Sequence, residues 1–477
     1  MAIPKVELPP RRFYLGNEYV DSVRSPGDRL TLINPVDDSV VADDVPAAAK
    51  EDVDHAVALG REAFRKGPWA KFTGIQRAAC LNKFADLVEK NVERLAYAES
   101  LPTGRPVAGI IHFDLAHMVQ VHRYYAGWAD KIAGESFGED NGFAKIVRYK
   151  PLGVCAGIAS WNSTFLYIGW KLAPALAAGN TFIFKPSEKS PLGVLALAPL
   201  FAEAGFPPGV VQFVTGAQET GSLLASHMDI AKISFTGSIA AGKAVQEAAT
   251  RSNLKKTTLE LGGKSPALVF GDADFENAVG RVLVEESIAS KFLDAAKAVF
   301  EGIGQQMGTS PLEMSTSHGP VVDKLQFDRI MSFIEKGKTS ANLLTGGKRL
   351  GSKGCFIEPT LFVNPDPQSP IWKEEVFGPV LAVRTFRTEE EAIDMANDSV
   401  YGLAACVYTS DISRALRVSA ALESGGVAIN SPYLPELNTP FGGIKQSGQG
   451  RELGAHGLYS YLEPQSVHIR VTEASKL

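Results

Sequence analysis

The spacing of apolar residues changes along the chain, and this change separates predicted strands from predicted helices. Between residues 151 and 249, short and almost wholly apolar runs alternate with longer segments in which apolar residues recur every three or four positions. The runs predict strands at 154–158, 181–184, 210–214 and 232–235, and the longer segments predict helices at 169–178, 191–204, 219–226 and 240–249. This alternation favours an α/β fold with a doubly wound parallel sheet, which binds ligands at the carboxyl ends of its strands.

The flanking segments predict further elements. Residues 13–41 alternate like short strands, and helical spacing marks 52–66, 75–92 and 112–133. Beyond residue 284, a helix capped by Ser287 is followed by strands and helices that alternate to about residue 457, which predicts a second α/β domain. Exposed strands are predicted at 143–149 and 459–471.

One stretch carries the clearest chemistry, the sequence Leu-Glu-Leu-Gly-Gly-Lys-Ser-Pro at 259–266. Its two glycines directly follow a strand-like run, so the backbone can turn tightly and approach a ligand closely. Glu260 lies at the strand end, where α/β sheets place their reactive groups. The alternative interpretation of this stretch is an ordinary glycine turn at a strand end, with Glu260 exposed to solvent and without a function. A phosphate loop is excluded, because that motif needs a glycine where this chain has Thr258.

The usual dinucleotide fingerprint, Gly-x-Gly-x-x-Gly, follows none of the predicted strands. Instead, Phe-Thr-Gly-Ser at 235–238 ends a strand and enters a predicted helix. The first turn of a helix offers free backbone N–H groups and here also a hydroxyl, which makes a suitable seat for a pyrophosphate. Many turns between a strand and a helix contain these residues, so the motif alone is a weak indication.

The stretch at 259–266 resembles the general-base segment of the NAD(P)-dependent aldehyde dehydrogenase family. Other motifs of that family follow in its order, namely Trp161-Asn162, Lys-Pro-Ser-Glu at 185–188, Phe-Thr-Gly-Ser at 235–238, Glu-Glu-Val-Phe-Gly-Pro at 374–379 and Pro-Phe-Gly-Gly at 440–443. The resemblance covers nearly the whole chain. It implies an NAD-binding domain at 1–130 and 151–262, a catalytic domain at 263–458, and oligomerisation strands with a C-terminal tail at 131–150 and 459–477.

The resemblance also implies roles for individual residues. Glu260 would be the general base that activates water, and the Asn162 amide would stabilise the oxyanion. The chain has Ser163-Thr164 where the family usually has an aromatic residue and a proline, so the rigid placement of this amide is not assured by the sequence. The implied cofactor-binding residues are Trp161, Lys185, Glu188, Gly237, Ser238, Leu261, Gly262, Glu375 and Phe377. A carboxylate at Glu188 accepts hydrogen bonds from ribose hydroxyls and repels a 2′-phosphate, which favours NAD over NADP.

The nucleophile of the family is absent. The family places a cysteine shortly after the Glu260 segment, in the pattern Phe-x-Asn-x-Gly-Gln-x-Cys. This chain instead passes from Asp-Phe-Glu-Asn-Ala-Val at 274–279 straight into Gly-Arg-Val-Leu-Val at 280–284. About twenty residues are missing at this junction, a length of roughly 30 Å if helical. The catalytic domain is therefore truncated near 279–281.

Three functional hypotheses follow. The resemblance implies an oxidoreductase that oxidises an aldehyde to a carboxylic acid with NAD, and the missing cysteine puts that activity in question for this chain. The first alternative is a non-catalytic family member that binds NAD or serves as a subunit in an oligomer. The second is an incorrectly spliced gene model of an active enzyme. None of the four cysteines, Cys80, Cys155, Cys355 and Cys406, stands at a position that could replace the nucleophile.

Composition narrows the setting. The net charge of −5 and the lack of a strongly basic run argue against nucleic acid as a partner, and no apolar run approaches the length of a membrane span. Four scattered cysteines argue against a disulfide framework or a zinc site. Histidines at 112, 117 and 122 are spaced by five residues, which spreads them around a helix, so no metal site is expected there.

The C-terminal residues Ser475-Lys476-Leu477 form the tripeptide that directs proteins to peroxisomes. We therefore expect a peroxisomal location and an import receptor as a partner, with the cytoplasm as the alternative. The remaining expected partners are a small-molecule aldehyde and, by resemblance, further copies of the chain in a homodimer or homotetramer.

Overall fold

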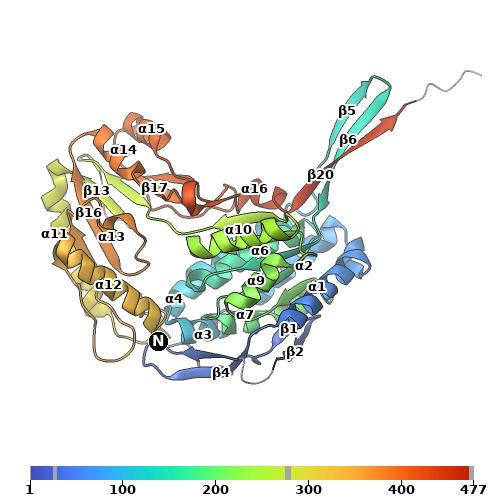
Figure 1. Ribbon diagram of the computed structural model, residues 1–477, viewed down its shortest axis with the longest axis horizontal. Coiled ribbons are helices and arrows are strands. Elements are labelled where there is room, and N and C mark those ends of the chain that lie inside the picture. Colours follow the sequence, from blue (N-terminus) through green and yellow to red (C-terminus); the bar gives the residue numbers. More distant parts are fainter. Residues whose placement is uncertain (1, 25–28, 274–280, 472–477) are drawn as a thin grey trace, which may run out of the picture.

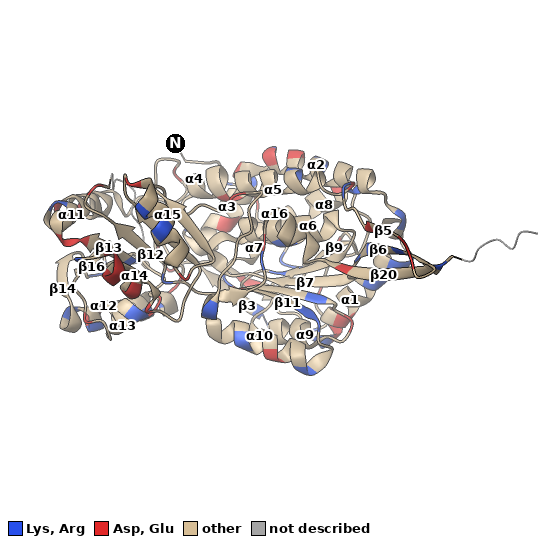
Figure 2. Cartoon of the chain, turned by 90° about the horizontal axis from the view of Figure 1, so that it is seen from above, with Lys and Arg blue, Asp and Glu red and all other residues tan. Residues whose placement is uncertain are grey.

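The computed structural model describes residues 2–24, 29–273 and 281–471. Two sheets dominated by parallel strands form two lobes, and a three-stranded arm extends away from the body (Figure 1). The junction at 279–280 and the C-terminal tripeptide both lie outside the described residues. Basic and acidic residues are interspersed along the elements of both lobes (Figure 2).

The first lobe contains the doubly wound parallel sheet that the sequence predicted. Its strand order is β19-β11-β10-β7-β8-β9-β1-β2, and the five strands from β11 to β9 run parallel. All residues of β7, β8 and β10 are buried, as is typical of central strands in a parallel sheet that is covered on both faces. The strands are β1 (Phe13–Leu15), β2 (Glu18–Val20), β7 (Val154–Ile158), β8 (Thr181–Lys185), β9 (Val211–Phe213), β10 (Lys232–Thr236), β11 (Lys256–Glu260) and β19 (Gly448–Gln449).

Helices cover both faces of this sheet, and each layer buries its own apolar cluster. One face carries α1 (Lys50–Arg65), α9 (Gln218–Ser226) and α10 (Ile239–Ser252). The other carries α2 (Gly74–Glu89), α3 (Val92–Thr103), α5 (Ala116–Ala126), α6 (Thr164–Ala177), α7 (Pro191–Leu197) and α8 (Pro199–Ala204). The helix predicted at 112–133 both begins and ends earlier in the chain than expected. It begins with a short α4 (Val107–Gly109) and a π-helical turn at Ile110–Leu115, and α5 ends at Ala126.

The second lobe contains a sheet of order β14-β15-β16-β13-β12-β17-β18, in which only β14 is antiparallel. Its strands are β12 (Pro266–Val269), β13 (Arg281–Glu285), β14 (Asn342–Thr345), β15 (Thr360–Val363), β16 (Val380–Phe386), β17 (Ala404–Tyr408) and β18 (Gly426–Ile429). Its helices are α11 (Ala289–Gln306), α12 (Lys324–Ser340), α13 (Pro370–Lys373), α14 (Glu389–Asn397) and α15 (Ile412–Ala421).

The truncation lies between two strands that pair directly. β12 and β13 are parallel neighbours, with Pro266 opposite Arg281 and Val269 opposite Val284. Only residues 270–280 join the end of β12 to the start of β13. A parallel crossover needs about a dozen residues, so the connection is close to the shortest that this pairing allows. The sheet therefore keeps its strand order despite the loss of the segment.

Two further groups of strands complete the fold. The hairpin of β3 (Arg29–Ile33) and β4 (Val40–Pro46) lies apart from both large sheets. The arm has the order β20-β6-β5, with β5 (Glu135–Asp140), β6 (Phe143–Pro151) and β20 (Leu462–Arg470) all antiparallel. It exposes the side chains of Phe137, Phe143 and Ile469. Among the described residues, no helix is both long enough and apolar enough to cross a membrane.

Late residues of the chain return to the first lobe. The two-residue strand β19 pairs antiparallel with β11, so that Gly448 lies opposite Glu260. Ser447 reinforces this contact, because its carbonyl accepts from Leu261 N at 2.9 Å and its hydroxyl donates to the Gly262 carbonyl at 2.6 Å. The short helix α16 (Gly454–Tyr459) then packs against α6. The strand that ends in Glu260 is thus covered by residues from near the C-terminus.

Candidate active site

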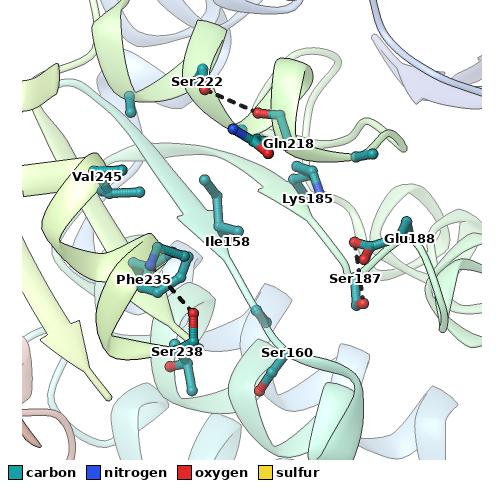
Figure 3. Close-up of a pocket in the computed structure, with 18 of the residues that line it drawn as sticks. Ile158, Ser160, Lys185, Ser187, Glu188, Gln218, Ser222, Phe235, Ser238 and Val245 are labelled. Atoms are coloured by element: carbon teal, nitrogen blue, oxygen red, sulfur yellow. Dashed lines mark hydrogen bonds between the residues drawn. The ribbon is translucent and has the colours of Figure 1, made fainter. Parts of the chain in front are cut away.

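A cleft of about 610 Å³ lies at the carboxyl ends of β7, β8 and β10 (Figure 3). This is the sheet edge at which parallel α/β folds bind ligands. Five of the predicted cofactor-binding residues line the cleft: Trp161, Lys185, Glu188, Gly237 and Ser238. Side chains of α9 and α10 complete its wall, among them Gln218, Ser222 and Val245.

The start of α10 offers an anion-binding geometry at this cleft. Ser238 caps the helix, and its hydroxyl accepts from Ala241 N at 3.3 Å. Close packing requires glycine on either side of this cap: a Cβ at Gly237 would lie 2.6 Å from the Phe235 ring, and one at Gly242 would lie 2.4 Å from Leu261. The backbone can therefore approach a phosphate group at the positive end of a fourteen-residue helix.

Lys185 and Glu188 form the polar end of the cleft. The Lys185 ammonium is buried and donates to the Pro186 carbonyl at 2.9 Å. Burial lowers the pKa of Lys185 to about 8, although the nearby Glu188 carboxylate opposes this shift. The only hydrogen bond to the Glu188 carboxylate within the described residues is a long one of 3.4 Å from the Ser187 hydroxyl. Its oxygens can therefore accept hydrogen bonds from ligand hydroxyls.

A second cavity, of about 370 Å³, lies on the other side of Thr236. We call it the tunnel. Thr236 lines both the cleft and the tunnel, and its buried hydroxyl has no hydrogen-bond partner within the described residues. Among the described residues that line the tunnel, Glu260 is the only charged one. The two cavities thus meet at a hydroxyl that a bound ligand could engage.

Five of the fifteen residues that line the tunnel are aromatic. Its rings belong to Phe113, Tyr167, Trp170, Tyr433 and Phe441. The five lie far apart in the sequence and on elements that read as ordinary helices and loops. The π-helical turn at 110–115 contains Phe113, and such turns are frequent at functional sites. This change of helical register was not visible in the apolar spacing.

Trp170 is held in the tunnel wall by a histidine. Its indole N–H donates to His117 Nε2 at 3.0 Å, and its ring packs against Phe441 with centroids 4.7 Å apart. Because an indole nitrogen can only donate, His117 Nε2 must accept and the imidazole must be neutral. Burial lowers the pKa of His117, which favours the neutral form.

Glu260 is 3% exposed, and neither of its carboxylate oxygens has a hydrogen bond of ordinary geometry within the described residues. Burial raises its pKa well above the usual value, and the nearby Glu452 adds to this rise, while Lys171 and Arg451 oppose it. Glu452 itself accepts from Lys171 Nζ at 2.7 Å and from the Ser234 hydroxyl at 2.8 Å. In the protein without ligands, the Glu260 carboxyl therefore keeps its proton to a higher pH than an exposed glutamate does, and a hydrogen-bond donor that reaches its oxygens would favour the carboxylate form that acts as a base.

Asn162 itself lines neither cavity, but residues on both sides of it do. Its neighbours Ser160 and Trp161 line the cleft, whereas Ser163 and Tyr167 line the tunnel. Its Oδ1 accepts from the Ser160 hydroxyl at 2.6 Å and from the Tyr167 hydroxyl at 3.2 Å. Within the described part of the chain, its Nδ2 has no hydrogen-bond partner and can donate to a ligand.

None of the four remaining predicted cofactor residues lines the cleft. Phe377 packs edge-on against Trp161, with ring centroids 5.2 Å apart, and has a left-handed backbone with φ 56°. The Glu375 carboxylate approaches Gly262 so closely that a Cβ there would lie 2.4 Å from its Oε2. Leu261 lines the tunnel, not the cleft. The second lobe thus places Phe377 against Trp161 of the cleft and Glu375 against Gly262.

None of the four cysteines lines the cleft or the tunnel. Cys80, Cys155 and Cys355 are buried, and Cys406 is half-buried on β17. Burial raises the pKa of all four thiols, to about 12 for Cys155 and about 11 for Cys355. A thiol with a raised pKa holds little of the reactive thiolate at neutral pH. Among the described residues, no group of three or more metal-ligating side chains occurs.

Comparison with known proteins places these observations in a family. The model of the aldehyde dehydrogenase family matches residues 22–280 and 277–467. The chain belongs to the aldehyde dehydrogenase family. The two matched stretches meet at 277–280, the same point at which the sequence lacks the expected segment.

Relatives of this aldehyde dehydrogenase family member extend over its whole length. It is 43% identical to an aldehyde dehydrogenase of Emericella nidulans, over 98% of this chain and 96% of the relative. It is 42% identical to cytosolic aldehyde dehydrogenase 1 of Mus musculus, over 97% of this chain and 95% of the relative. Among solved structures, the NAD⁺ complex of aldehyde dehydrogenase from Bacillus cereus has a TM-score of 0.93 and 37% identity, and covers 99% of this chain and 100% of that one.

Proposed function

We propose that this chain binds NAD in the cleft and an uncharged aromatic aldehyde in the tunnel, and that it does not oxidise the aldehyde in its 477-residue form. The observation that carries the proposal is the meeting of the two cavities at Thr236, with the unpartnered Glu260 carboxyl on the tunnel side. The cleft suits NAD, because its helix start accepts a pyrophosphate and Glu188 accepts ribose hydroxyls. Crystallised relatives include NAD⁺ complexes.

The chemistry of the tunnel decides the substrate class. Five aromatic rings and several aliphatic side chains form its wall, and they favour a flat apolar body by stacking and burial. A charged substrate would have no counterion except Glu260. The Asn162 amide would polarise the aldehyde carbonyl, while Glu260 would take a proton from water. Bound NAD would accept a hydride, a step that first needs a nucleophile on the carbonyl carbon.

Binding can be tested without turnover. NAD at 100 times its Kd should stabilise the purified protein by about 2.7 kcal/mol, and 4-(dimethylamino)cinnamaldehyde should bind with a change in its absorption spectrum. Trp170→Ala should weaken binding of this probe about tenfold through lost ring contact, with the stabilisation by NAD unchanged. The proposal fails if NAD gives no stabilisation, or if the Trp170 variant binds the probe as tightly as the parent.

The preference for NAD over NADP rests on one carboxylate. Glu188→Gln should lower the ratio of the affinity for NAD to the affinity for NADP about tenfold. Removing the charge ends the repulsion of a 2′-phosphate, while an acceptor for the ribose hydroxyls remains. Isothermal titration with both cofactors measures this change. Glu219→Gln, on nearby α9 but outside the cleft lining, serves as the control and should leave the ratio unchanged. An unaltered ratio in the Glu188 variant would contradict the role of this residue.

A second candidate function is an active NAD-dependent dehydrogenase in which the missing segment is present. It is favoured by the two intact family matches that meet at 277–280. Sequencing the transcript across the codons for Val279 and Gly280 distinguishes the two. An intact transcript without a cysteine codon at this point would exclude the active dehydrogenase and support the non-catalytic function.

The arm and the C-terminus support two further proposals. The arm exposes Phe137, Phe143 and Ile469 on a thin sheet, and burial against other copies would cover these side chains in a homodimer or homotetramer. Light scattering of the parent and of a Phe137→Glu, Ile469→Glu variant tests this. Import into peroxisomes through Ser475-Lys476-Leu477 is tested by locating the tagged protein with and without this tripeptide.

A further inference from the structure

The Asn162 amide lies on a turn whose sequence gives it little rigidity. The 3₁₀ turn Trp161–Ser163 joins β7 to α6, and its neighbours Ser160, Ser163 and Thr164 are small and polar. An asparagine side chain on such a turn can rotate, and its amide group can hydrogen-bond nearby backbone instead of a ligand. Something else must fix the direction of this amide if it is to serve the carbonyl of a substrate.

Two hydroxyl groups converge on one atom of this amide. Ser160 Oγ is 2.6 Å and Tyr167 Oη is 3.2 Å from Asn162 Oδ1, and both hydroxyls donate to it. They reach the amide from different elements, since Ser160 precedes the turn and Tyr167 lies within α6, one turn further on. Two bonds from two directions define the plane of an amide, which one bond cannot do.

Tyr167 is well suited to this task. Its ring is 8% exposed and packs edge-on against Trp170 with centroids 5.9 Å apart, so its position is set by the tunnel wall. Burial raises its pKa to about 12, so the hydroxyl keeps its proton and remains a donor at neutral pH. With Oδ1 occupied by two donors, the end of the amide left for a ligand is Nδ2, which can only donate.

We propose that Ser160 and Tyr167 are positioning residues that hold the Asn162 amide with Nδ2 presented to the carbonyl oxygen of a bound aldehyde. This inference rests on the proposed function, in which the tunnel binds an aldehyde. It goes beyond it in naming a hydroxyl pair that sets the direction of the oxyanion donor. Tyr167 therefore has two roles, as a ring in the tunnel wall and as a hydroxyl behind the amide.

The test compares Ser160→Ala/Tyr167→Phe with the parent protein, using 4-(dimethylamino)cinnamaldehyde as the probe. Donation to its carbonyl oxygen shifts the long-wavelength absorption band to the red. The double variant should lose most of this shift and bind the probe about fivefold more weakly, as expected for one lost hydrogen bond. The conservative variant Ser160→Thr should retain the shift, and Tyr167→Phe alone should lose part of it.

Ser190→Ala is the matched control. Its hydroxyl bonds to Thr164 Oγ1 at 2.9 Å near the start of α6 but does not contact Asn162. This variant should lose stability and keep the red shift. The proposal is overturned if the double variant keeps the full shift, or if the control loses as much of it.

A second measurement does not depend on ligand binding. Crystal structures of the unliganded parent and double variant should show the Asn162 side chain in one orientation in the parent and rotated or divided between orientations in the variant. An identical orientation in both proteins overturns the positioning role even if no aldehyde binds. Failure of the probe to bind the parent protein, by contrast, contradicts the proposed function and not the hydroxyl pair.

Discussion

Insertion of the missing segment between Val279 and Gly280 is expected to raise NADH formation from an aromatic aldehyde on the order of 10⁴-fold or more, because losing a nucleophile costs an enzyme rates of this size or larger. The residues can be taken from the corresponding part of the mouse relative, which matches this chain over nearly its full length. The insertion lengthens the short connection between β12 and β13 and leaves their pairing intact. NADH absorbance with saturating NAD measures the rate.

The same insertion with its cysteine changed to alanine is the control for the thiol. It should bind NAD as the parent does and give no more NADH than the parent. Equal rates for the uninserted chain and the inserted one would contradict the view that the truncation disables oxidation. Stabilisation by NAD in all three proteins shows that each is folded before rates are compared.

His122 is expected to make the fold sensitive to acid. Its side chain is fully buried between Phe84 and Phe201, its Nδ1 lies 2.8 Å from the Met118 carbonyl oxygen, and its Nε2 has no partner within the described residues. Burial lowers its pKa to about 4, with the backbone hydrogen bond opposing the shift. The unfolded chain takes up a proton near pH 6.5 and the folded protein does not, so stability falls as the pH drops from about 6.5 towards 4.

Replacing His122 by Asn should remove this sensitivity while keeping a donor to the Met118 carbonyl. Between pH 7.5 and 5, the free energy of unfolding of the parent should fall by about 2 kcal/mol more than that of the variant. Urea unfolding at each pH measures the difference. Glu99 acts in the opposite sense, since burial raises its pKa to about 8, but it is present in both proteins and its effect cancels. Parallel pH dependences of the two proteins would show that His122 does not titrate as expected.

Much of the first lobe could be predicted because its strands are buried on both faces. β7 is wholly apolar and β8 has three consecutive apolar residues, and the helices beside them keep a regular apolar spacing. The cleft at their carboxyl ends follows from this topology. Its residues Lys185, Glu188, Gly237 and Ser238 stand directly after strands, so their nearness in space could be read from the sequence.

The tunnel could not be predicted in the same way. Phe113, Trp170 and Tyr433 come from three elements whose contact depends on tertiary packing, and each ring alone reads as ordinary core. The raised pKa of Glu260 also escaped prediction, since it depends on burial and on the nearby Glu452. The three histidines at 112–122 were interpreted together, yet His117 bonds to Trp170 and His122 is enclosed by the core.

The pairing of β19 with β11 means that the surroundings of Glu260 are made by residues synthesised near the end of translation. A growing chain that has not yet reached Gly442 already contains every residue of the cleft on the first lobe, but its Glu260 still faces water. Gly442 then covers the carboxyl group so closely that a Cβ at this position would lie 2.7 Å from Glu260 Oε1. The proton affinity that distinguishes this carboxyl from any surface glutamate is therefore acquired only when the polypeptide is nearly complete.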